Sequence, residues 1–117
     1  MHRAERRYTR IECMRSHEWL DRRSLALHEA VAAKLQANPQ LLAVARSNLE
    51  RWLQAGSRTP LLEWRRILET TDLADLLALL RATDERSTRL RQSSPFPGVL
   101  TAEERQAILD RYESRRA

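Results

Sequence analysis

Hydrophobic residues recur along this chain at the three- and four-residue spacing of amphipathic helices. The clearest stripe predicts a helix over residues 16–37, with Ser16 as its N-cap. Asn38-Pro39 ends that helix and opens the next, because the residue before a proline avoids the α region while proline suits a first helical turn. The positions on the shared face of the stripe are Leu20, Ser24, Leu27, Val31 and Leu35.

Start and stop signals divide the middle of the chain into four more helices. Gly56 stands where a C′ glycine is expected, and Thr59-Pro60 is a cap residue followed by proline at the first helical position. Thr71 or Asp72 caps the next helix, and Thr83-Asp84 opens a fourth one whose apolar face is weak. The predicted ranges are 39–55, 60–69, 72–82 and 84–91.

The segment Ser93–Gly98 contains two prolines and a glycine, which exclude a helix and a central strand. A last helix then begins at Thr101, where Thr101 and Glu104 form a capping box. With only 2 Gly and 4 Pro in 117 residues, many tight turns are not expected. The sequence therefore predicts an all-α fold: a compact bundle of about five to six helices with an extended Pro-Phe-Pro segment before the last helix.

Domain organisation follows from the same pattern. Residues 16–117 are predicted to form a single helical domain, since this length suits one domain with a small core. Residues 1–15 are polar and Arg-rich, and are interpreted as a basic N-terminal arm without fixed structure. Met14 leaves a second interpretation open, in which translation starts there and the preceding residues are an extension.

Charge is distributed unevenly along the chain, whose net charge is +5. Residues 1–23 and 86–117 each carry seven basic and four acidic groups, whereas residues 24–85 carry seven and eight. Both ends are thus basic, as in segments that contact nucleic acid or an acidic protein, or simply as solvated ends. Of 21 basic residues only Lys34 is lysine, which reflects either a GC-rich genome or the use of arginine for phosphate and carboxylate recognition.

A search for catalytic or metal-binding patterns finds little. His28-Glu29 begins like the zinc-protease motif HExxH, but position 32 is Ala, so His28 is interpreted as a helix-surface or core-rim histidine. Cys13 is the single cysteine, and neither Gly56 nor Gly98 lies in a phosphate-binding loop. We expect no catalytic residues, no cofactor and no metal, and therefore a chain that is not an enzyme.

Two features remain as candidates for binding. The arginine pairs near the ends could contact phosphates, or could be ordinary surface. The Pro95-Phe96-Pro97 segment holds the single Phe of the chain between two prolines, and Tyr112 lies on the apolar face of the last helix. Phe96 could plug the chain's own core or fit a groove on a partner as a rigid anchor. The predicted nucleic-acid contacts are Arg6, Arg7, Arg22, Arg23, Arg115 and Arg116, and the predicted partner contacts are Pro95, Phe96, Pro97 and Tyr112.

Several stretches together resemble a family of small bacterial proteins encoded beside nucleotidyltransferase-like toxins. The resemblance lies in Ser24–His28, Asn38-Pro39, Trp52 and Leu90–Leu100, and covers the chain from about Met14 onward. Pro97 departs from the pattern, which usually has Ala there. The resemblance implies an antitoxin whose partner is a co-encoded toxin-like protein, and it assigns no functional residues.

Three functions are therefore weighed: an antitoxin-like module that neutralises a toxin by direct binding, a nucleic-acid-binding accessory protein that uses the basic ends, and a small enzyme. No membrane partner is expected, because the longest strictly apolar run spans only residues 76–80. The charged N-terminus lacks an apolar signal region and cysteine is scarce, so a cytoplasmic location is predicted.

Overall fold

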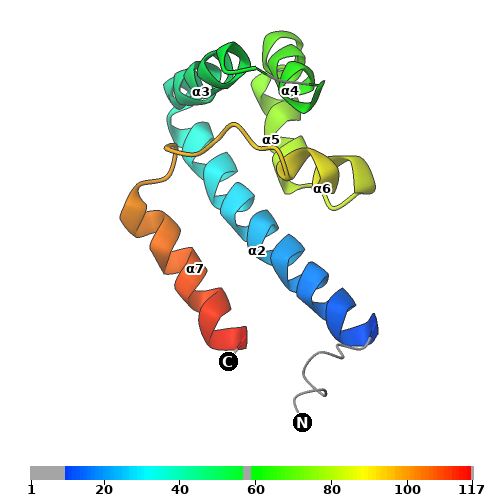
Figure 1. The fold of residues 1–117 in the computed structure, drawn as a ribbon. Helices are drawn as coiled ribbons and strands as arrows, with labels where there is room; N and C mark the ends of the chain where they lie inside the picture. The colour runs from blue at the N-terminus through cyan, green and yellow to red at the C-terminus, as the bar shows by residue number, and fades with distance from the viewer. Residues whose placement is uncertain (1–9, 57–58, 117) are drawn as a thin grey trace.

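A computed structural model describes residues 10–56 and 59–116, and within these ranges the chain forms helices and no strand. The predicted all-α bundle is confirmed, with six α-helices in the described residues (Figure 1). Their order along the chain is α2 (Arg10–Ala37), the 3-10 turn η1 (Pro39–Leu41), α3 (Leu42–Gln54), α4 (Thr59–Thr70), α5 (Leu73–Arg81), α6 (Glu85–Arg91) and α7 (Ala102–Arg116).

Helix α2 begins earlier than predicted. Its 28 residues start at Arg10, so Ser16 lies inside the helix and the prediction that it caps the helix is wrong. Residues 10–15 of the predicted arm are helical, and residues 1–9 lie outside the described ranges. At 1.5 Å per residue, α2 is about 42 Å long and extends beyond the other helices that pack on its C-terminal half (Figure 1).

Local capping explains where most of the other helices begin. Asp72 and Asp84 each accept a hydrogen bond from the backbone N–H three residues later, at 2.9 and 3.3 Å. The capping box is confirmed: Thr101 N–H donates to Glu104 Oε1 at 2.8 Å, and Glu104 N–H donates to Thr101 Oγ1 at 3.0 Å. Gly56 follows the end of α3 with φ of +115°, the conformation that favours glycine there.

The hydrophobic core lies between the C-terminal half of α2 and helices α3, α4, α5 and α6. Trp64 of α4 is completely buried, and its indole N–H donates to the Leu90 carbonyl at 2.8 Å. Leu90, the one large apolar residue of α6, is buried as well, which ties this short helix to the core. The buried apolar cluster comprises Val31, Ala32, Leu35, Ala45, Leu49, Trp64, Ile67, Leu68, Leu76, Leu77, Leu80, Leu90, Phe96 and Val99.

Helix α7 lies antiparallel to α2 (Figure 1). Near the start of α7, Glu104 pairs with Lys34 from the C-terminal half of α2. Further along α7, the Tyr112 carbonyl accepts a hydrogen bond from Trp19 Nε1 at 3.2 Å. These two contacts, spaced along both helices, hold α7 beside α2, so that the first turns of α2 and the last turns of α7 lie toward the same end of the molecule.

Candidate functional site

The segment between α6 and α7 crosses the C-terminal half of α2 and continues into α7 (Figure 1). Phe96, at its centre, is 3% exposed and belongs to the core. Its ring contacts Trp64 edge-on, with centroids 5.4 Å apart and an interplanar angle of 87°. Phe96 therefore plugs the chain's own core, which is one of the two alternatives predicted for it, and its contact with a partner stays a prediction.

The two prolines differ in their exposure. Pro95 is buried and Pro97 is exposed, so of the two prolines only Pro97 is accessible to a partner. Asn48 of α3 holds both residues: its side-chain NH₂ donates to the Pro95 carbonyl at 2.9 Å and to the Pro97 carbonyl at 2.8 Å. Asn48 Oδ1 in turn accepts from Arg51 Nη2 at 2.7 Å. One buried amide thus fixes the backbone on either side of Phe96.

His28 of α2 holds the start of the same segment. Nδ1 lies 2.7 Å from the Ser24 carbonyl, which can only accept, so Nδ1 carries the proton and donates. Nε2 is then an acceptor, and the Ser94 hydroxyl donates to it at 2.8 Å. Ser94 Oγ also accepts from Phe96 N–H at 3.2 Å. Burial lowers the pKa of His28, and repulsion from Arg91 lowers it further, against the raising effect of the Ser24 hydrogen bond.

Arg91 secures the end of α6, from which the segment departs. It is 5% exposed, and its guanidinium donates to the carbonyls of Leu80 at 3.4 Å and Ala82 at 2.6 Å. These carbonyls belong to the C-terminal end of α5, where a cation is favourable. The segment is therefore held by hydrogen bonds to α2 and α3, and is joined to a helix anchored on α5.

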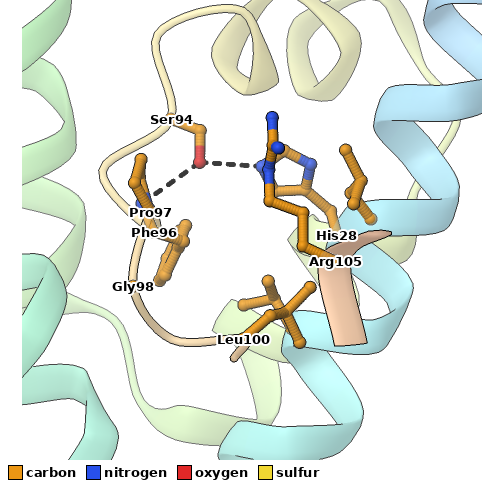
Figure 2. Close-up of a pocket in the computed structure, with 9 residues that line it drawn as sticks. His28, Ser94, Phe96, Pro97, Gly98, Leu100 and Arg105 are labelled. Carbon is orange, nitrogen blue, oxygen red and sulfur yellow. Dashed lines mark hydrogen bonds between the residues drawn. The ribbon is translucent and has the colours of Figure 1, made fainter. Parts of the chain in front are cut away.

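A pocket of about 170 Å³ opens beside this segment, between α2 and α7 (Figure 2). Its wall is largely apolar, but the Ser94–His28 hydrogen bond lies on one side and Arg105 of α7 projects toward it (Figure 2). The capping box fixes the first turn of α7 and thus the position from which Arg105 extends. The lining residues are Leu27, His28, Val31, Ser94, Phe96, Pro97, Gly98, Leu100 and Arg105.

The Ser94–His28 pair has the connectivity of a nucleophile and its base. In a catalytic triad, a carboxylate accepts the hydrogen bond from the histidine and stabilises the imidazolium. Here the acceptor is the Ser24 carbonyl, which carries no full negative charge. The lowered pKa also makes His28 a weaker base. These features favour a structural pair over a catalytic one.

The described ranges also contain no group of three or more His, Cys, Asp or Glu side chains that could hold a metal ion.

No helix in the described part of the chain combines the length and the apolar character that a membrane span requires.

The remaining predicted contact residues lie on α2 and α7 or outside the described residues. Tyr112 is half-buried on α7, where its carbonyl bonds Trp19. Arg22 is exposed, whereas the Arg23 guanidinium lies over the Trp19 ring at 5.1 Å from its centroid. Arg6 and Arg7 lie outside the described residues. Arg115 and Arg116 lie in the last turn of α7, and their side chains lie outside the described part.

Sequence reasoning missed the two polar anchors, Asn48 and Ser94, and the rim residue Arg105. A signal for Asn48 is present: it occurs at helical spacing among Ala45, Leu49 and Trp52, where a polar residue must find a buried partner. Ser94 and Arg105 carry no comparable signal, because their roles depend on how the segment crosses α2.

Comparisons with protein-family models, with curated proteins and with solved structures found no match to this chain.

Proposed function

We propose that this chain is a non-catalytic protein-binding module, antitoxin-like in function, whose partner is a co-encoded toxin-like protein that it neutralises by direct contact. The proposed contact surface is the N-terminal half of α2 together with α7. The resemblance described above supplies the class of partner, and the distribution of apolar side chains on α2 supplies the surface.

The observation that carries the proposal is the uneven burial of one apolar stripe. On the C-terminal half of α2, Val31 and Leu35 of this stripe are buried in the core. Leu27, one turn before Val31, is half-buried, and Leu20, on the N-terminal half, is 42% exposed. The chain's own core thus ends before Leu20 and leaves this leucine of the stripe exposed. An apolar anchor on an amphipathic helix is a recurrent element of protein-binding surfaces.

The surroundings of Leu20 fit such a surface. A hollow of about 330 Å³ lies beside it between α2 and α6, with charged and polar residues around the leucine. Interfaces commonly combine an apolar anchor with a polar rim that excludes water. The residues that line the hollow are His17, Leu20, Asp21, Arg23, Ser24, Thr88, Arg91 and Gln92.

Co-expression with the product of the adjacent gene tests the proposal. We expect the chain to restore growth that the partner inhibits, and to co-purify with it in high salt, because an apolar interface tolerates salt. Leu20→Asp is expected to weaken the complex on the order of tenfold or more, as substitutions of interface anchors do. Leu62→Asp is the matched control, since Leu62 is 49% exposed but lies on α4. The proposal would be refuted if the chain neither restored growth nor co-purified with the partner. Equal effects of the two variants would refute the proposed contact surface.

A second function, nucleic-acid binding, is favoured by the antiparallel arrangement of α2 and α7. Because Trp19 bonds Tyr112, the helix positions of Arg10 and Arg15 lie toward the same end as those of Arg115 and Arg116. Basic residues from both ends of the chain would then form one phosphate-binding region. Binding to duplex DNA that collapses between low and moderate salt supports this function, and the absence of binding at low salt excludes it.

A further inference from the structure

The pocket beside Phe96 has the size of one compact apolar group. Its volume of about 170 Å³ is close to the roughly 150 Å³ of an apolar protein cavity that binds benzene. Sites for complete small-molecule ligands are larger, at about 300–1,000 Å³. Leu27, Val31 and Leu100 give the pocket a wall that suits a branched aliphatic side chain. The dimensions therefore favour a single residue of another chain over a whole metabolite.

The polar groups of the pocket differ in whether their hydrogen bonds are already used. His28 and Ser94 satisfy each other, and both also bond the backbone. Arg105 is exposed and forms no ion pair or side-chain hydrogen bond within the described residues. A guanidinium offers donors and no acceptor, in a planar fork that matches a carboxylate. A ligand of this pocket should therefore carry a carboxylate beside its apolar group, to pair with the Arg105 guanidinium.

We propose that this pocket binds the carboxyl-terminal residue of a partner protein, with an apolar side chain beside Phe96 and the terminal carboxylate on Arg105. The last residue of a chain carries both an apolar side chain and a carboxylate on one Cα atom, and capture of a terminal carboxylate is a recurrent mode of peptide recognition. This inference rests on the proposed function, because it assumes that the chain binds a protein.

The test uses the purified full chain and three small probes. N-acetyl-leucine mimics a terminal residue, N-acetyl-leucinamide lacks its charge, and 4-methylpentanoate lacks the backbone amide. In an NMR titration we expect N-acetyl-leucine to shift the amide signals of Gly98 and Leu100 with a Kd on the order of millimolar, as suits about a dozen non-hydrogen atoms. N-acetyl-leucinamide should bind about fivefold more weakly, because it cannot form the exposed ion pair with Arg105.

Arg105→Gln should abolish the preference for the acid over the amide. Arg111→Gln is the matched control, because Arg111 is also exposed on α7 but does not line the pocket. Absence of saturable shifts, equal binding of acid and amide, or tighter binding of 4-methylpentanoate would each overturn the proposal. The titration needs no partner and Leu20 lies outside this pocket, so a negative titration beside a successful co-purification rejects the pocket alone. A positive titration without co-purification rejects the proposed function.

Discussion

Replacing Asn48 with Ala should destabilise this protein far more than replacing an asparagine on the surface would. Asn48 is 6% exposed and donates to two carbonyls, those of Pro95 and Pro97. A typical hydrogen bond contributes about 1 kcal/mol net, and a buried polar group left without a partner costs about 1–3 kcal/mol. The variant also loses the hydrogen bond that Asn48 Oδ1 accepts from Arg51, and it leaves the carbonyl of the buried residue Pro95 without this donor. We expect Asn48→Ala to lower the free energy of unfolding by about 2–4 kcal/mol.

Urea unfolding followed by circular dichroism measures this change. The midpoint should fall with an unchanged m-value, because the variant removes contacts without altering the surface exposed on unfolding. In a thermal scan, about 4 °C per kcal/mol at this chain length gives a decrease in Tm of roughly 8–16 °C. Asn48→Asp has nearly the same shape but replaces the donor with an acceptor facing two carbonyls, so it should destabilise at least as much at neutral pH.

Ser47→Ala is the matched control, because Ser47 is the exposed neighbour of Asn48 on α3 and should change stability by less than about 0.5 kcal/mol. A loss below about 1 kcal/mol for Asn48→Ala would refute the reasoning. It would show that the two proline carbonyls do not depend on this amide.

Two further predictions concern residues that contact the same segment. Because burial lowers the pKa of His28, the unfolded chain takes up a proton near pH 6.5 before the folded chain does. Stability is therefore complete above that pH and falls as the pH drops from about 6.5 toward the lower folded pKa, by at most about 1.4 kcal/mol per pH unit. Urea midpoints across this range should show the slope in the wild type and in His17→Gln, an exposed control, but not in His28→Gln; a slope retained by His28→Gln contradicts the assignment. Phe96→Ala should cost about 3–5 kcal/mol of stability, the usual effect of emptying a buried aromatic site. Urea unfolding checks this cost, and a loss well below that range would contradict the enclosure of the ring by the core.

The sequence was sufficient to predict the helices because their start and stop signals are local. Each capping side chain bonds a backbone N–H three residues away, and all of these hydrogen bonds form. The caps are Asp72, Asp84 and the Thr101–Glu104 box. The predicted start of α2 was wrong because it too relied on a local signal. Ser16 has the chemistry of a cap, but such a residue can also lie inside a long helix.

The site could be predicted only in part, because it depends on contacts across many residues. The sequence identified the Pro95–Pro97 segment as unusual, yet its path is set by Asn48 and His28, which lie 47 and 66 residues away from the groups they bond. Gly98 adds a similar constraint: its φ is +97°, and a Cβ there would lie 3.2 Å from Val44 Cγ1 of α3. Local patterns contain no information on such pairings.

The hydrogen bonds that hold the segment also link the core to both proposed binding regions. The segment leads directly into α7, so the amide of Asn48 and the imidazole of His28 influence where α7 lies against α2. Apolar burial of Phe96 alone would leave the segment free to slide, whereas these directional bonds fix its backbone and hence the pocket wall. A change at Asn48 can therefore weaken partner binding without touching the partner. If this is right, Asn48→Ala should bind N-acetyl-leucine more weakly than the wild type even under conditions in which the variant is fully folded.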